Sequence, residues 1–151
     1  MFRGMLREGD LPRVGPARNA LGVVTSAEKP ENAPREWVPD IDPDGAGVVR
    51  TATGGMSVAP SLSALPAHRI PERLRERGVT KAVGSNKLFV WSHGDGDFQA
   101  GPVAPGLALR PDAGVRPTHG VVEPAAAMTV EAFRERLAAT AGNWAVDEPS
   151  K

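Results

Sequence analysis

A chain of 151 residues is long enough to form one domain with a buried core, and its 18 basic residues balance 18 acidic ones. This balance excludes a net field that would hold the protein to nucleic acid or to an anionic membrane, although it leaves a local basic patch open. The lack of cysteine excludes disulfides, thiol nucleophiles and cysteine-rich zinc sites, and no apolar run has the length of a membrane span.

The first half of the chain predicts short strands separated by a long loop. An apolar segment around Arg3 indicates a strand from which that side chain projects. Further strands are expected at Gly22–Thr25 and Gly47–Thr51, which are rich in β-branched residues and flanked by turn-forming ones. The polar, proline-rich residues 26–45 between them predict a surface loop. One helical turn is expected at 61–65 and a short helix at 70–78, with Pro71 at its first helical position and Gly78 as its stop.

The second half predicts three more strands and one helix. Strands are expected at Lys87–Trp91, near Leu107 and at 119–122, with a turn at 93–97. A helix should begin after Thr129 as its N-cap, with an apolar stripe formed by Val130, Phe133 and Leu137. Seventeen glycines and 15 prolines exclude a regular helical bundle. We therefore predict an α+β fold, a compact single domain of short, mainly antiparallel strands and a few short helices over 1–143, followed by a polar, frayed tail at 144–151.

Two candidate metal motifs lack the ligands that they would need. The stretch "DIDPDG" at 40–45 has the acidic spacing that opens an EF-hand loop, but its twelfth position is Thr51 instead of a bidentate glutamate. The three histidines are far apart and lack the spacing of helical zinc ligands. We therefore expect no metal site and interpret the acidic stretch as a solvated turn.

Two polar residues in unusual surroundings are the candidate functional residues. Ser57 follows two glycines in "TGGMSV", where a backbone can turn sharply or let a ligand approach closely. Because it is not in a Gly-x-Ser-x-Gly elbow, a binding hydroxyl is favoured over a nucleophile, with a plain surface turn as the alternative. Glu123 stands where an apolar strand meets a proline, so it either faces solvent or is held at the strand end for a purpose.

Four patches in order along the chain resemble one family. "MFRGML", "TGGMSV", "RIPERL" and "THGVVEPAAAM" are similar in order and rough spacing to the type VI secretion exported effector two family. Members of that family resemble ADP-ribosyltransferases in fold, and related proteins consume NAD. The resemblance thus implies an ADP-ribosyltransferase-like toxin domain at 1–143, whereas residues 79–117 match nothing in the family.

The resemblance also implies a role for each candidate residue. Arg3 would grip the NAD phosphates, Ser57 with Thr53 beside it would shape the nicotinamide-ribose pocket, and Glu123 would serve the ribose. These residue types suit the chemistry, because cleavage of the nicotinamide–ribose bond passes through an oxocarbenium-like ribose that a carboxylate can stabilise. An arginine offers a planar, permanently charged fork to phosphate oxygens. The competing interpretations are a surface ion pair for Arg3 and a solvent-facing carboxylate for Glu123.

The resemblance implies an NAD-consuming bacterial toxin that uses NAD as substrate, as an ADP-ribosyltransferase or an NAD glycohydrolase. A catalytically silent binding module of the same fold is the alternative, and another NAD-degrading toxin family with an Arg, Ser and Glu set is a third. The expected partners are NAD, a cognate immunity protein and a macromolecular ADP-ribose acceptor, with no membrane, DNA or RNA. Such a toxin would act in the cytoplasm of a target cell and reach it without a cleaved signal peptide.

Overall fold

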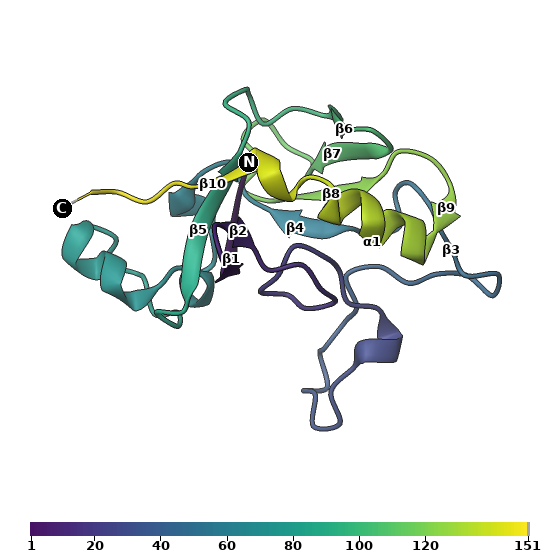
Figure 1. Cartoon of the computed structure of the whole chain (residues 1–151), viewed down its shortest axis with the longest axis horizontal. Coiled ribbons are helices and arrows are strands. Elements are labelled where there is room, and N and C mark those ends of the chain that lie inside the picture. The colour runs from purple at the N-terminus through teal and green to yellow at the C-terminus, as the bar shows by residue number, and fades with distance from the viewer. Residues whose placement is uncertain (151) are drawn as a thin grey trace.

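Two four-stranded antiparallel sheets form the framework of the computed structural model, which describes residues 1–150 (Figure 1). The first sheet has the order β10–β5–β1–β2, formed by Trp144–Val146, Leu88–His93, Phe2–Glu8 and Leu11–Pro12. The second has the order β4–β8–β7–β6, formed by Met56–Val58, Gly120–Pro124, Leu107–Pro111 and Gly101–Ala104. A small ladder pairs β3 (Val48–Val49) with β9 (Met128–Thr129).

The helices are short. The α-helix α1 spans Val130–Ala138, and 3₁₀ turns are formed by Ser26–Glu28 (η1), Leu62–Ala64 (η2), Ala67–Arg69 (η3), Glu72–Arg77 (η4) and Ala141–Asn143 (η5). Thr129 caps α1 as predicted, because its hydroxyl accepts the backbone N–H of Ala132 at 3.1 Å. None of the helices within residues 1–150 is long and apolar enough to cross a membrane.

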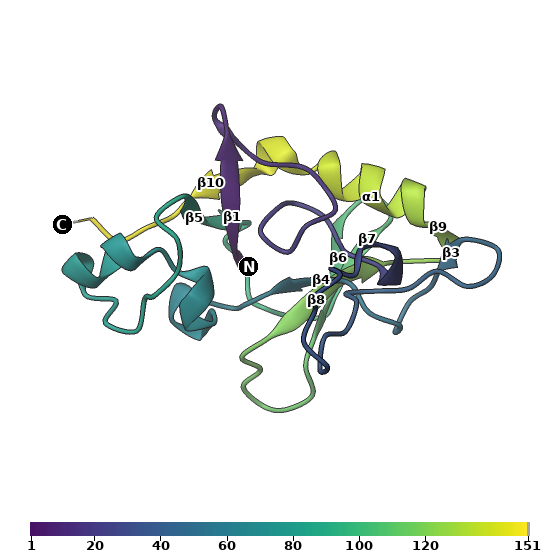
Figure 2. The ribbon, with the colours of Figure 1, turned by 90° about the horizontal axis from the view of Figure 1, so that it is seen from below.

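A backbone bridge joins the two sheets. Phe2 and Ala59 exchange backbone hydrogen bonds of 2.8 and 2.9 Å, which join the start of β1 to the chain just after β4. Beyond this bridge the strands diverge, and Figure 2 shows β1 running across the direction of β4. The main core fills the space between the sheets and α1, with Met5, Trp91 and Phe133 among its fully buried members. A second cluster packs η2–η4 against the opposite face of β1 and β5.

The predicted fold class is confirmed at the level of a single domain with mainly antiparallel strands and few helices. Strands were correctly expected around Arg3, at Lys87–Trp91, near Leu107 and at 119–122. Each contains apolar residues that the folded chain buries, so the local pattern carried enough information. The apolar stripe of α1 is also confirmed, since Val130, Phe133 and Leu137 are buried.

Three predictions of local structure are wrong. Gly22–Thr25 forms no strand, because the backbone N–H of Val24 bonds to the carboxylate of Asp40 at 2.8 Å instead of to a neighbouring strand. The expected short helix does form, as a 3₁₀ helix at Glu72–Arg77 that Gly78 ends in the left-handed region (φ 98°), but the predicted place of Pro71 is wrong, because it is the N-cap rather than the first helical residue.

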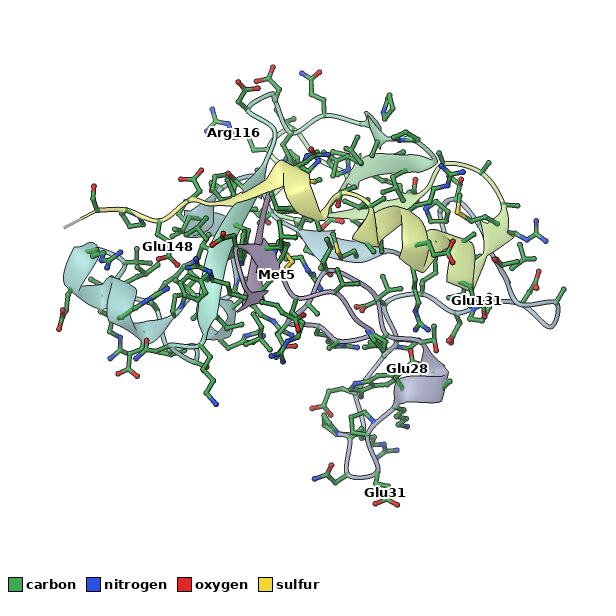
Figure 3. The ribbon with its side chains drawn as sticks, viewed as in Figure 1. Met5, Glu28, Glu31, Arg116, Glu131 and Glu148 are labelled. Carbon is green, nitrogen blue, oxygen red and sulfur yellow. The ribbon has the colours of Figure 1, made fainter. Side chains whose placement is uncertain are left out.

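The expected frayed tail is the third error. Trp144–Val146 pairs with β5 as β10, and Trp144 is buried with its indole N–H donated to the Thr140 hydroxyl at 3.0 Å. Further on, the Glu148 carboxylate bonds to Arg73 at 2.9 Å and accepts the backbone N–H of Val90 at 3.0 Å. Figure 3 shows Glu148 beside β5 and the η4 region. Residue 151 lies outside the described residues.

Candidate functional site

A pocket of about 290 Å³ lies beside the bridge where the two sheets diverge. It collects polar side chains from several elements, namely Arg3 from β1, Ser57 from β4, Arg18 and Asp40 from irregular segments, and Arg69 from η3. His68 and His119 also line it. Three guanidinium groups and a single carboxylate make the pocket positively charged in a chain whose net charge is zero.

Arg3 is buried and donates hydrogen bonds to backbone carbonyls. Its Nε bonds to Ala20 at 3.1 Å, its Nη2 bonds to Arg18 and Ala20 at 3.0 Å each, and its Nη1 bonds to Ser57 at 2.7 Å. Burial lowers the pKa of Arg3 to about 10, although the nearby Asp40 carboxylate acts in the opposite direction. A surface ion pair, the alternative for this residue, is wrong, because Arg3 is 6% exposed and its contacts join β1 to two other segments.

Gly4 brings η3 against β1. A Cβ at Gly4 would clash with the carbonyl oxygen of Arg69, so only glycine allows this approach. The close packing places the Arg69 side chain at the pocket that Arg3 lines. Burial lowers the pKa of Arg69, and the positive charge of Arg18 lowers it further. No hydrogen bond or ion pair engages the Arg69 guanidinium within residues 1–150.

Arg18 and Asp40 form the opposite wall of the charged cluster. Arg18 Nε lies 3.9 Å from the Asp40 carboxylate, its Nη2 donates to the carbonyl of Val38, and its guanidinium lies 5.1 Å from the centre of the Trp37 ring. The Nε atom is buried without a hydrogen-bond partner among the described residues. The Asp40 carboxylate also accepts the Val24 N–H, so it compensates the positive charge of Arg18 only in part.

Ser57 lies at the pocket on the face of the second sheet that looks away from the main core. Its neighbours in β4, Met56 and Val58, are buried, while Ser57 is partly exposed and pairs with Val121 of β8. Its carbonyl holds Arg3, and its hydroxyl has no partner within the described chain, so the hydroxyl is free to meet a ligand. Gly55, two residues before Ser57, allows close pairing of β4 with β8 rather than the approach of a ligand, because a Cβ at Gly55 would clash with the backbone of β8.

Glu123 is buried but does not line the pocket. It is 4% exposed, and its Oε2 accepts the Arg110 Nε at 2.8 Å and the Ala52 N–H at 2.9 Å. A solvent-facing glutamate is therefore the wrong interpretation. Glu123 lies two residues beyond Val121 on β8, so Ser57 and Glu123 share one sheet face as diagonal neighbours, roughly 7–8 Å apart.

Thr53 lies in the turn that Glu123 holds. Ala52 adopts a left-handed conformation (φ 67°), and its N–H is the one that the Glu123 carboxylate binds. The Thr53 hydroxyl donates to the carbonyl of Arg50 at 2.6 Å, and Thr53 is exposed outside the pocket. The structure thus brings Arg3 and Ser57 together, sets Glu123 at the next position along the same face, and leaves Thr53 apart.

The acidic stretch at 40–45 binds backbone amides. Asp40 accepts the Val24 N–H, Asp42 accepts the Ser26 N–H at 2.7 Å, and Asp44 accepts the Ala46 N–H at 2.8 Å. The first two bonds fix the end of the long loop to its beginning, and the third closes a local turn. Within residues 1–150, no three histidine, aspartate or glutamate side chains gather closely enough to hold a metal ion.

Sequence reasoning missed Arg18, Asp40 and Arg69 as members of the site. All three come from segments without regular structure or from a single 3₁₀ turn, so no periodicity marks the direction of their side chains. The pair Arg3-Gly4 was the available signal, because a glycine beside a buried arginine indicates close approach of another segment. No protein-family model matches the chain, and no curated protein gives a significant match.

Proposed function

We propose that this chain is an NAD-consuming enzyme that cleaves the nicotinamide–ribose bond, transferring ADP-ribose to an acceptor or to water. The observation that supports it most is the convergence of three guanidinium groups and the free Ser57 hydroxyl on one pocket. A dinucleotide carries its negative charge on a pyrophosphate, which matches a cluster of arginines.

Arg18 and Arg69 bind the pyrophosphate in this proposal, because Arg3 is largely occupied. Arg3 already donates to several carbonyls, so its main task is to hold the pocket wall together and supply positive charge. Arg69 has no partner, and Arg18 lies close enough to lower its pKa. An anion between these side chains relieves their repulsion and supplies the missing acceptors.

The nicotinamide riboside extends from the pocket along the sheet face that carries Ser57 and Glu123. Ser57 positions this end by a hydrogen bond, and Glu123 stabilises the positive charge that develops on the ribose as the bond to nicotinamide breaks. Glu123 Oε2 is held by Arg110 and Ala52, whereas Oε1 has no hydrogen-bond partner in the part of the chain described. The carboxylate is therefore held in a fixed orientation with one oxygen free.

A catalytically silent binding module is the second candidate. It is favoured by the position of Glu123 outside the pocket lining and by its ion pair with Arg110. In such a module the basic pocket holds an anionic ligand or a partner side chain, and no bond is broken.

Nicotinamide release from NAD separates the two candidates. Purified protein is incubated with NAD, free nicotinamide is measured by chromatography, and NAD binding is measured by calorimetry. Arg69→Gln should weaken NAD binding, whereas Arg136→Gln, an exposed substitution on α1, is the charge-matched control. Release supports the enzyme, binding without release selects the silent module, and the absence of both rejects both candidates.

The partners follow from the same proposal. An immunity protein would inhibit by covering the pocket, and a macromolecular acceptor would become labelled when the protein is incubated with NAD and a lysate of the target cell. Expression in the bacterial cytoplasm should then be toxic, and toxicity should disappear in the Arg69→Gln variant if NAD consumption causes it.

A further inference from the structure

A second basic depression adjoins the pocket on the far side of Arg69. It has a volume of about 570 Å³ and shares His68 and Arg69 with the pocket, so these two residues form a common wall. Its other basic lining residues are Arg7, Arg13 and Lys87, from β1, the chain after β2 and the chain before β5. No acidic side chain lines it within residues 1–150. We call the depression lined by Arg7, Arg13, Arg69, Lys87 and His68 the basic groove.

Most of the charge in the basic groove is unbalanced. Arg13, Arg69 and Lys87 have neither a hydrogen bond nor an ion pair through their side-chain nitrogens within the described residues. Arg7 donates to the carbonyl of Gly9 at 2.7 Å and pairs with the fully exposed Asp10 at 3.2 Å. Cations gathered without counter-charges repel one another, so an anionic partner gains from binding here. Because the whole chain has no net charge, the groove is a local feature rather than a consequence of composition.

The aromatic content of the basic groove argues against nucleic acid as its occupant. Proteins that bind single strands combine cations with aromatic rings on which bases stack. Phe89 is the aromatic residue of the groove apart from His68, and the guanidinium groups of Arg7 and Arg73 lie 5.3 and 4.8 Å from its ring centre. A ring already covered by cations offers a base little stacking surface. Carboxylates need only the positive charges, which the groove supplies.

We propose that the basic groove binds an acidic segment of a partner protein. Glutamate and aspartate side chains of that segment pair with Arg13 and Lys87, and its end nearest the pocket reaches Arg69. The proposal does not depend on NAD turnover, because its residues other than His68 and Arg69 lie outside the pocket. Through Arg69, it predicts that an acidic segment and an anion in the pocket compete.

The test compares three labelled probes by fluorescence anisotropy at low ionic strength. The first is a peptide of alternating glutamate and alanine, the second has glutamine in place of glutamate, and the third is an oligothymidylate of matched charge. The groove variant is Arg13→Gln/Lys87→Gln. The control is Lys29→Gln/Arg116→Gln, which removes the same charges at exposed positions elsewhere. Figure 3 shows Arg116 at one edge of the molecule and Glu28 and Glu31, which flank Lys29, on the protruding loop.

The glutamate peptide should bind the wild-type protein and the control variant with equal affinity. Its affinity for the groove variant should be about tenfold lower, since each exposed ion pair contributes modestly. Added salt should weaken the binding, and inorganic pyrophosphate should displace the peptide. Equal binding of the glutamine peptide, or equal loss in the control variant, would overturn the proposal. Tighter binding of the oligothymidylate than of the glutamate peptide would also overturn it and assign the groove to nucleic acid. Both variants replace exposed side chains without partners, so circular dichroism should show an unchanged fold.

Discussion

The Nη1 of Arg3 donates to the carbonyl oxygen of Ser57 at 2.7 Å, which joins the first strand of one sheet to the edge strand of the other. The same guanidinium holds the segment 18–22 through the carbonyls of Arg18 and Ala20. One buried side chain therefore fixes three walls of the pocket. Because its charge is compensated by carbonyl dipoles and by the nearby Asp40, its position depends on every one of those contacts.

Arg3→Lys should lower both stability and ligand binding. Lysine keeps the charge but carries its three donors on one nitrogen, whereas arginine spreads five over three, so the carbonyls that Arg3 holds, including those of Ala20 and Ser57, lose partners. We expect a loss of about 3 kcal/mol or more in the free energy of unfolding, the scale of one or two charged hydrogen bonds. Urea denaturation measures it. If Arg3→Lys weakened NAD binding but left stability unchanged, Arg3 would act as a direct phosphate ligand instead of a support.

Gly4→Ala should disrupt the pocket through η3. The added methyl group would clash with the carbonyl of Arg69, and overpacking of this kind typically costs about 1–3 kcal/mol. Gly45→Ala is the matched control, because nothing lies within 4 Å of a Cβ at that position. The melting temperature should fall in Gly4→Ala and stay unchanged in Gly45→Ala. A Gly4→Ala protein with wild-type stability and wild-type NAD binding would mean that η3 can move away without consequence for the site.

The sequence predicted the elements that short apolar runs and local caps define, and missed the contacts that assemble the site. The strand around Arg3 and the cap at Thr129 are encoded in neighbouring residues, so local rules found them. Arg18, Asp40 and Arg69 meet only because irregular segments cross one another, and no local pattern carries that information. The strand at Trp144 was missed because a single buried tryptophan followed by two exposed residues has no period, and its partner strand lies far away in the chain.

The resemblance to a toxin family implied that Arg3 and Ser57 serve one site, and both side chains line the same pocket, but their roles toward NAD stay predictions. It did not include Arg18 and Arg69, whose guanidinium groups have fewer hydrogen-bond partners than that of Arg3. A family motif names residues that recur, whereas the burial and hydrogen-bond partners of each residue in this chain decide which cations remain available to a ligand.

Ser57→Ala should slow nicotinamide release without altering the fold. The hydroxyl has no partner in the described structure, and the contact that matters for stability is made by the Ser57 carbonyl, which alanine retains. We expect an unchanged melting temperature and a reduced rate with NAD. Mass spectrometry of the protein during turnover gives a further check, because a covalent adduct on Ser57 would contradict a purely positioning role.

His93 should make the protein less stable in mild acid. Burial, and secondarily the charged N-terminus, lower the pKa of His93 below its usual 6.5. As the pH falls below 6.5, the unfolded chain therefore takes up a proton before the folded one, and the free energy of unfolding decreases. Above pH 6.5 His93 is neutral in both states, and this destabilisation vanishes. His93→Phe keeps a ring against Trp144, 5.2 Å away, and removes the titration. Urea denaturation at several pH values should show a smaller acid loss in the variant, and an identical loss would exclude His93 as its source.

Glu123→Gln tests whether the carboxylate acts on the ribose or only holds the turn at Ala52. Glutamine can still accept the Ala52 N–H, so the turn should survive, but the negative charge is lost. If Glu123 stabilises the developing cation, nicotinamide release should fall by roughly a hundredfold to a thousandfold, while NAD binding changes little. Arg110→Gln is the matched control, because it breaks the same 2.8 Å ion pair and leaves the carboxylate in place. Normal turnover in Glu123→Gln, with equal small stability losses in both variants, would assign Glu123 to structure alone. Melting curves of both variants must accompany the rates, because a lower rate reports on the ribose only in a variant that stays folded.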